Sequence, residues 1–329
     1  MKKFINQVEL VEDQMIQGMV KAYPQYVRKL DCGNVVVRTE KKEGKVALIS
    51  GGGSGHEPAH GGYVGTGMLD AAVAGAVFTS PTPDQIYEGI KAIATDKGVL
   101  MVIKNYTGDV MNFEMAGEMA QMDDIKVAQV VVDDDVAVDG SLYTVGRRGV
   151  AGTVFVHKIA GAKAEEGAEL EEVQRVAQKV IDNVRTMGVA IRPCTVPAAG
   201  KPGFELGEDE MEVGIGIHGE PGTHKEKLRP ADEIVDHILD KILADIDYTG
   251  HEVAVMVNSS GATPLMELFI INNHVADVLA EKGIKVYKTF VGEYMTSLEM
   301  EGFSVSLLRL DDEMKALLDA HADTIAFKA

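Results

Sequence analysis

Cysteine is scarce in this sequence, and long apolar runs are missing. The two cysteines, Cys32 and Cys194, lie far apart without a CxxC or zinc-ligand spacing, which argues against a disulfide framework or a cysteine zinc site. No run of about 18 apolar residues could span a bilayer, and the N-terminal residues lack the apolar core of a signal peptide. We therefore expect a cytoplasmic protein that does not enter a membrane.

Basic residues are few relative to acidic ones. The chain of 329 residues has 32 Lys and Arg against 51 Asp and Glu, which gives a formal net charge of −19. Affinity for nucleic acids and anionic membranes depends mainly on Lys and Arg, so such a chain would repel both. Direct binding of nucleic acid is not expected.

Apolar residues and glycine are abundant. The sequence is 46% apolar and has 35 glycines, spread in short clusters between the apolar runs. This composition is typical of a globular chain that turns often between buried strands, and the length suits two domains or one large one.

The first half of the chain alternates between strand and helix patterns. A helical spacing at 11–19 and a β-branched run at 35–39 form an entry segment. Apolar runs that predict buried strands and stretches that predict helices then follow in turn: strands at 46–49, 99–103 and 127–132, and helices at 83–94 and 113–121. This alternation favours a largely parallel sheet covered by helices.

A second set of elements follows a polar, charge-rich helix predicted at 164–186. It comprises strands at 211–217, 253–257, 285–287 and 303–308, and helices at 231–246 and 264–282. The predicted fold class is therefore α/β, with two α/β domains that each have a helix-covered sheet. We expect residues 1–185 to carry a glycine-rich ligand loop and residues 186–329 to carry His218.

The glycine-rich loop SGGGSGHEP (50–58) follows the first buried strand. It is not a P-loop, because no lysine ends it, and it is not a GxSxG nucleophile elbow, because His56 replaces the last glycine. Without Cβ atoms, several backbone N–H groups can approach a small polar ligand, with His56 beside them as a proton carrier. A simple tight turn is the alternative.

The segment GIGIHG (214–219) matches the dinucleotide fingerprint GxGxxG. That fingerprint must open a helix, whereas the turn sequence EPG (220–222) follows here, so a nicotinamide cofactor is not expected. His218 ends an apolar strand among glycines, where its imidazole can face a pocket. A purely structural histidine is the alternative.

Three further polar segments are candidates. Lys104 and Asp109 follow a predicted strand, where Lys104 can hold a substrate oxygen and Asp109 can act as a general base, unless they form a surface ion pair. The aspartates at 133–135 alternate in direction along extended chain and cannot all face one metal ion. The arginines in GRRG (146–149) can contact an anion or a partner, or serve capping or internal ion pairs.

Together these segments resemble the substrate-binding K subunit (DhaK) of the dihydroxyacetone kinase family, in its multi-subunit, phosphoenolpyruvate-dependent form. The resemblance runs along essentially the whole chain, and its motifs occur in the family's order. The motifs are SGGGSGHEP (50–58), FTSPTPD (78–84), IKNYTGD (103–109), GRRGV (146–150), CTVP (194–197), GIHGEPG (216–222) and GATPL (261–265).

The resemblance implies a covalent mechanism. His218 would attack the ketone carbon of dihydroxyacetone to form a hemiaminal, Asp109 would take the proton from the hydroxyl that is phosphorylated, and His56 would assist as acid or base. A covalent gate of this kind admits hydroxyketones and excludes glycerol. The implied substrate-binding residues are Gly53, Ser54, Gly55, His56, Lys104, Asp109 and His218.

The resemblance also implies partners. No metal or cofactor is expected on this chain, which ends where single-chain, ATP-using members of the family continue into a nucleotide domain. ADP or ATP with Mg²⁺ is expected on a separate L subunit, which a phosphotransferase-system M subunit rephosphorylates. A homodimer is expected, and a transcription regulator is a possible partner. The alternative function is a non-catalytic paralogue that senses dihydroxyacetone as a transcriptional co-regulator.

Overall fold

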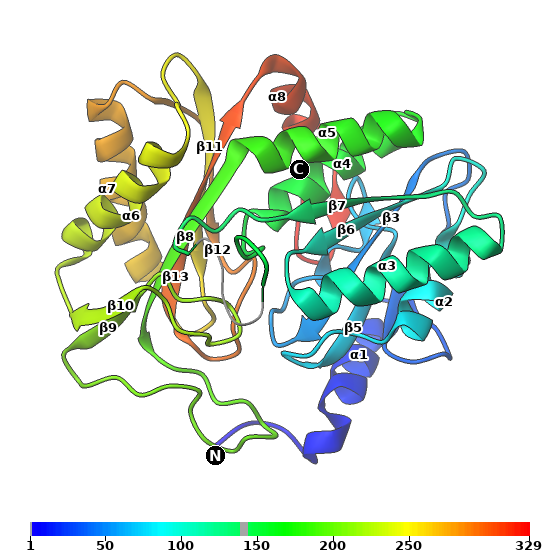
Figure 1. Ribbon diagram of the computed structural model, residues 1–329, viewed down its shortest axis with the longest axis horizontal. Helices are drawn as coiled ribbons and strands as arrows, with labels where there is room; N and C mark the ends of the chain where they lie inside the picture. Colours follow the sequence, from blue (N-terminus) through cyan, green and yellow to red (C-terminus); the bar gives the residue numbers. More distant parts are fainter. Residues whose placement is uncertain (1, 139–143) are drawn as a thin grey trace.

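The computed structural model describes residues 2–138 and 144–329, and within these ranges the longer strands form two six-stranded sheets (Figure 1). The first sheet has the strand order β1-β2-β5-β3-β6-β7, in which β5, β3, β6 and β7 run parallel and β2 is antiparallel to both of its neighbours, β1 and β5. Its strands are β1 (Val27–Lys29), β2 (Val35–Arg38), β3 (Ala47–Ser54), β5 (Ala71–Val77), β6 (Val99–Lys104) and β7 (Val127–Val132).

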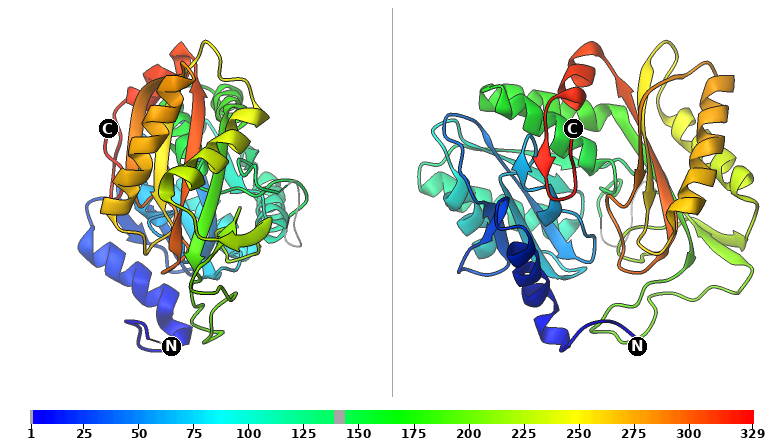
Figure 2. Two further views of the ribbon diagram at one scale, coloured as in Figure 1. Left: turned by 90° about the vertical axis from the view of Figure 1, so that its left-hand side faces the viewer. Right: turned by 180° about the vertical axis from the view of Figure 1, so that it is seen from behind.

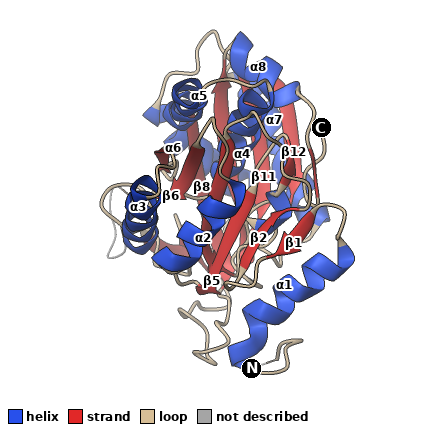
Figure 3. Ribbon diagram, turned by 90° about the vertical axis from the view of Figure 1, so that its right-hand side faces the viewer, coloured by secondary structure: helices blue, strands red, loops and turns tan. Residues whose placement is uncertain are grey.

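Helices cover both faces of this sheet. On one face, α2 (Pro83–Ile93) and α3 (Thr107–Met122) pack over an apolar core, and α2 begins at a capping box formed by Thr82 and Gln85. On the other face lie α4 (Thr153–Glu165) and α5 (Leu170–Asn183). The N-terminal helix α1 (Val11–Ala22) packs beside β1 and β5 (Figure 3).

The second sheet has the strand order β10-β9-β8-β13-β11-β12 and is antiparallel apart from the β11–β12 pair. Its strands are β8 (Val184–Arg192), β9 (Glu210–Val213), β10 (His224–Lys227), β11 (Glu252–Ser259), β12 (Lys285–Gly292) and β13 (Glu301–Leu310). Helices α6 (Ala231–Asp245) and α7 (Leu265–Glu281) cover its outer face. Its inner face packs with α4, α5 and α8 (Asp312–Asp319).

The largest core lies between the two sheets. Helix α4 is buried along nearly its whole length there, because apolar and small residues occupy every side of it. The chain end returns to the first sheet's side of the molecule, where β14 (Asp323–Thr324) pairs with β4 (Gly65–Thr66) (Figure 2). Short 3-10 turns occur at Val8–Leu10 and Gly61–Tyr63. In the part of the chain described, no helix is long and apolar enough to cross a bilayer.

The predicted fold class is confirmed, since the chain is an α/β protein with two helix-covered sheets. Three details differ from the expectation. The charge-rich helix expected at 164–186 is α5 alone, preceded by the buried α4 and followed by β8. Residues 51–54 continue strand β3 instead of leaving it as a loop. Strand β9 ends at Val213, before the glycine-rich segment. The domain boundary near residue 185 stays a prediction.

Candidate functional site

A cleft of about 560 Å³ lies between the two parts of the molecule, the first part holding the first sheet and the second part the second sheet. On the first part it opens beyond the carboxyl ends of β3 and β6, where α/β sheets usually bind ligands. Its lining residues are Gly53, Phe78, Ser80, Tyr106, Thr107, Gly108, Asp109, Gly203, His218, Gly219, Glu220 and Pro221.

Strand β3 brings Gly53 to the cleft and needs glycine there. A Cβ atom on Gly53 would lie 2.5 Å from the backbone nitrogen of Thr79, so a side chain would push β3 away from the Phe78–Thr79 turn. Ser54 and Gly55 have protein partners: the Ser54 hydroxyl donates to the Gly75 carbonyl at 2.7 Å, and the Gly55 N–H lies 3.1 Å from both carboxylate oxygens of Glu57. These two residues lie outside the cleft lining.

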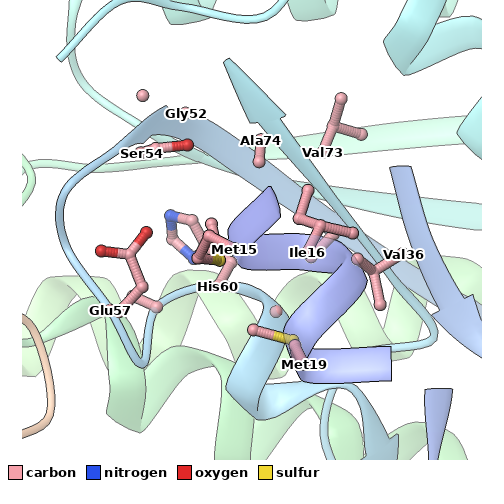
Figure 4. Close-up of a pocket in the computed structure, with 14 residues that line it drawn as sticks. Met15, Ile16, Met19, Val36, Gly52, Ser54, Glu57, His60, Val73 and Ala74 are labelled. Atoms are coloured by element: carbon pink, nitrogen blue, oxygen red, sulfur yellow. The ribbon is translucent and has the colours of Figure 1, made fainter. Parts of the chain in front are cut away.

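A much smaller pocket lies on the other side of the glycine strand. It measures about 20 Å³, room for about one water molecule, which is too small for a triose. Figure 4 shows Ser54, Glu57 and His60 around it, facing the apolar side chains of Met15 and Met19 from α1. The large cleft is therefore the candidate substrate site.

Lys104 and Asp109 come together behind Gly52. A Cβ atom on Gly52 would lie 3.2 Å from Nζ of Lys104 and 3.3 Å from Oδ2 of Asp109. Burial raises the pKa of Asp109 although the charge of Lys104 and a hydrogen bond from Ser80 oppose it, and burial lowers the pKa of Lys104. Nζ of Lys104 and Oδ1 of Asp109 are buried without a hydrogen-bond partner among the described residues. Both atoms are available to bind a polar ligand.

His56 and His218 meet at the wall of the cleft, where His218 belongs to the lining and His56 is buried behind it. Their Nε2 atoms lie 3.1 Å apart, and Nδ1 of His56 lies 2.9 Å from the carbonyl oxygen of Thr296. A carbonyl oxygen only accepts hydrogen bonds, so Nδ1 of His56 carries a proton and its Nε2 is an acceptor. Burial and the charge of Lys104 hold the pKa of His56 well below its usual value, which keeps the ring neutral. His56 is therefore placed to accept a proton from Nε2 of His218.

The two parts of the chain hold these histidines jointly. His56 follows β3, but the segment between β12 and β13 clamps it, since the N–H of Leu298 donates to the Gly55 carbonyl at 2.7 Å. His218 lies in the turn between the antiparallel strands β9 and β10. No helix opens there, so the GxGxxG match lacks the helix on which a dinucleotide would dock. Tyr106 and Phe78 pack edge-on against the His218 ring, at centroid distances of 4.4 and 5.3 Å.

Glu220 is a buried residue of this cleft for which the sequence predicted no role. Its Oε2 accepts the backbone N–H of His218 at 2.7 Å, and its Oε1 lies 3.6 Å from Nδ1 of the same histidine. Burial acts to raise the pKa of Glu220, but the hydrogen bond and charge of His218 and the charge of Arg148 outweigh it and lower the pKa to about 2. The His-x-Glu spacing is the signal that was available in the sequence.

The remaining charged candidates serve internal contacts. Asp134 accepts the N–H groups of Val150 and Gly152 at 2.8 Å, while Asp135 pairs with the buried Arg148 at 2.6 Å. Arg147 pairs with Asp245 at 2.6 Å. The two arginines of GRRG therefore form internal ion pairs. Among the residues described, no three His, Cys, Asp or Glu side chains gather as metal ligands.

Comparison with known proteins identifies the family of the chain. The Dak1 domain model matches residues 17–326. The dihydroxyacetone-binding subunit DhaK of PTS-dependent dihydroxyacetone kinase 1 from Listeria innocua is 56% identical over 329 residues, which cover 99% of this chain and 100% of that protein.

Two solved structures share the fold. The dihydroxyacetone kinase of C. freundii has a TM-score of 0.93 and 35% identity, and the match covers 99% of this chain but 60% of that one. The dihydroxyacetone kinase operon co-activator Dha-DhaQ has a TM-score of 0.89 and 38% identity, over 95% of this chain and 97% of that one. The resemblance predicted from the motifs is confirmed. The chain belongs to the Dak1 family, together with the DhaK subunits of PTS-dependent dihydroxyacetone kinases.

Proposed function

We propose that this chain is the dihydroxyacetone-binding subunit of a multi-subunit dihydroxyacetone kinase and that it holds the ketone covalently on Nε2 of His218. The observation that carries the proposal is the 3.1 Å contact between Nε2 of His218 and Nε2 of His56 at the wall of the cleft. A nucleophile beside an oriented base is the usual arrangement for covalent catalysis.

Capture proceeds by addition to the carbonyl group. His56 accepts the proton from Nε2 of His218, and the freed lone pair of that nitrogen forms a bond to the ketone carbon. The π electrons of the carbonyl move to its oxygen, which then takes the proton back from His56. The product is a hemiaminal with one hydroxyl in place of the ketone. Glycerol has no electrophilic carbon and cannot react in this way.

Phosphoryl transfer requires a second proton acceptor on the captured substrate. Asp109 lines the same cleft, and Lys104 lies beside it with an unpaired Nζ in the described structure. In the proposed reaction Lys104 and the backbone of Gly53 bind substrate oxygens, and Asp109 removes the proton of the terminal hydroxyl as it attacks phosphorus. Ser54 and Gly55 shape the loop that presents Gly53.

The phosphoryl group comes from a partner. The proposed donor is a nucleotide-bearing L subunit that holds ADP or ATP with Mg²⁺ and is recharged through a phosphotransferase-system M subunit. The name of the L. innocua relative, a PTS-dependent kinase subunit, supports this assignment. A homodimer and a cytoplasmic location remain part of the proposal.

The test is intact-protein mass spectrometry after incubation with dihydroxyacetone, followed by a phosphoryl-transfer assay with the L and M subunits and phosphoenolpyruvate. We expect a mass increase equal to one dihydroxyacetone, peptide mapping to His218, and its loss in His218→Ala. An adduct that persists at full yield in His218→Ala would refute the choice of nucleophile.

A sensor of dihydroxyacetone is the second candidate. The similarity to the operon co-activator Dha-DhaQ favours it, because that chain matches nearly the full length. A sensor needs the covalent anchor but not a base for phosphoryl transfer, so Asp109 in the cleft lining, with Lys104 buried beside it, favours the kinase subunit. An adduct without turnover with any partner set would establish the sensor instead.

A further inference from the structure

Both nitrogens of the His218 ring face hydrogen-bond acceptors. On one side Nε2 faces Nε2 of His56, which is an acceptor because the Thr296 carbonyl holds the His56 proton on Nδ1. On the other side Nδ1 lies 3.6 Å from Oε1 of Glu220, an ion-pair distance that is longer than a hydrogen bond. A neutral imidazole has one N–H group and can satisfy only one of these acceptors. The arrangement suits a ring that carries both protons.

The Glu220 carboxylate is built into this position. Its side chain is about 2% exposed, and it occupies the place that a side chain on residue 216 would need, since a Cβ atom on Gly216 would lie 2.1 Å from the carboxyl carbon. The backbone N–H of His218 donates to Oε2 at 2.7 Å, so the same carboxylate contacts both the backbone and the ring of this residue. Gly216 in the motif GIHGEPG is thereby explained.

A buried cation stands behind Glu220. Nη1 of Arg148 lies 4.0 Å from Oε1 of Glu220, and the rest of the guanidinium bonds Asp135 and the Gly214 carbonyl. Arg148 is fully buried, and its charge adds to the hydrogen bond and charge of His218 in lowering the pKa of Glu220. The other titratable groups near His218 are Tyr106, whose ring packs against it, and Asp109, whose charge acts on it across the cleft. Glu220 is thus the anion placed against Nδ1.

We propose that Glu220 is a positioning residue that keeps a proton on Nδ1 of His218, so that the ring is cationic in the free protein and again in the adduct. This inference rests on the proposed function, because it concerns how the proposed nucleophile is prepared. A cationic ring is needed because Nε2 must lose its proton before it can attack the ketone. Removing that proton from a cationic ring leaves a neutral nucleophile, whereas removing it from a neutral imidazole leaves an imidazolate, which a histidine base cannot produce.

The proposed capture step conserves protons and charge. The cationic ring gives its Nε2 proton to His56, and the neutral ring that keeps Nδ1–H attacks the ketone through Nε2. The alkoxide takes the proton from His56. The adduct then has a positive ring beside the Glu220 carboxylate and a neutral His56, as at the start. No further donor or acceptor is required.

The test combines nitrogen-15 NMR of the histidine rings with capture kinetics on the full chain. In the substrate-free protein at neutral pH we expect both ring nitrogens of His218, assigned by loss of signal in His218→Ala, to be protonated. In Glu220→Gln, whose amide oxygen can still accept the backbone N–H, we expect a neutral ring. The capture rate should fall on the order of 10²-fold, in line with the larger loss of about 10⁴-fold on removing the carboxylate behind a catalytic histidine in a protease triad.

Controls separate charge from folding. Glu220→Asp keeps the charge and should retain the cationic ring and most of the capture. A second His-x-Glu pair, His224 and Glu226, lies on β10 outside the cleft lining, with the ring and the carboxylate 3.5 Å apart. Glu226→Gln removes that carboxylate and should change neither the ring protonation of His218 nor the capture rate.

Two results overturn the proposal: a neutral His218 ring in the unmodified protein, whichever nitrogen carries the proton, or unchanged ring protonation and capture in Glu220→Gln. The NMR measurement needs no substrate. It therefore decides this point even if the protein captures no ketone, in which case the proposed function fails separately.

Discussion

Asp109 and Lys104 show, at the scale of single residues, how burial prepares a base. Burial raises the pKa of Asp109, so this carboxyl group takes up a proton at a higher pH than an exposed aspartate does. The Lys104 charge and the hydrogen bond from Ser80 oppose that shift and keep the group usable as a base. The surroundings of Asp109 thus shift its pKa in opposing directions, as is common for catalytic carboxylates.

The first prediction concerns Asp109→Asn. Covalent capture should stay within a few-fold of the normal rate, while phosphoryl transfer should fall on the order of 10²-fold or more, the range for a lost general base. In the unmodified protein the transfer rate should decline as pH falls through the raised pKa of Asp109, and the variant should lack this limb. Capture by mass spectrometry and coupled turnover measure the two steps, with Asp123→Asn as a control outside the cleft lining. Unchanged turnover in Asp109→Asn would remove this residue from the mechanism.

Part of the site could be predicted from local sequence. His56, Lys104 and Asp109 follow buried strands, and the carboxyl ends of parallel strands meet at one edge of a sheet, so their grouping was foreseeable. Glu220 and Arg148 could not be assigned in this way. The His-x-Glu spacing places Glu220 near His218, but no periodicity or spacing reports its contact with Arg148, which forms only when the two parts of the molecule fold against each other.

At the scale of elements, a charged cluster holds the end of α4 to the first sheet. Arg38 on β2 donates to Glu165, the last residue of α4, at 2.9 Å, and Lys45 lies 3.5 Å away. Burial acts to raise the pKa of Glu165, but the charge of Lys45 and the contacts with Lys42 and Arg38 outweigh it and lower the pKa to about 2. The ionised carboxylate therefore stabilises the folded state.

The second prediction is that Glu165→Gln lowers the free energy of unfolding at pH 7 by about 1–2 kcal/mol, a value reduced for solvent screening. Because the folded-state pKa lies below the unfolded value of 4.5, the stabilisation is present above pH 4.5 and is lost as pH falls toward 2. Urea unfolding of both proteins between pH 7 and about pH 2.5 measures the difference across the window in which it should disappear. Glu166→Gln, at an exposed neighbour, should change stability by less than about 0.5 kcal/mol. A difference that grows on acidification would contradict the assigned sign.

Element prediction succeeded where periodicity was clear and failed where burial was complete. The range predicted for β7 matches the structure, and the starts of α2 and α6 were found at Pro83 and Ala231. Helix α4 was not recognised as a separate element because it is apolar on all sides and has no amphipathic stripe. Strand β5 was missed because its alanines and glycine carry little strand preference, so only pairing with β2 and β3 defines it.

For the whole molecule, the core between the sheets is one apolar cluster to which both parts contribute. Ala254, Met256 and Leu308 of the second sheet share an apolar cluster with Val154 and Ile159 of α4. If the second part is separated from α4 and α5, this inner face becomes exposed to water. We propose that the boundary near residue 185 separates two sheets that depend on each other for stability.

The third prediction follows from that shared core. A fragment of residues 186–329 should show no cooperative urea transition by far-UV circular dichroism, whereas the full chain should unfold cooperatively. The fragment keeps α8 but lacks α4 and α5, which also pack on its inner face, and it lacks the first residues of β8. A sharp transition for the isolated fragment would show that the second part folds on its own.

The clamp on His56 has a consequence for heat inactivation. His56 is carried by the first part, but the carbonyl that fixes its tautomer belongs to Thr296 of the second part, which also carries His218. The proton acceptor, its orienting group and the nucleophile are therefore aligned only while the two parts keep their register. A displacement of about 1 Å can cost on the order of 10²-fold in rate. On warming, covalent capture should therefore be lost while every helix and strand is still intact. Loss of activity would then report loosening between the two parts and not unfolding.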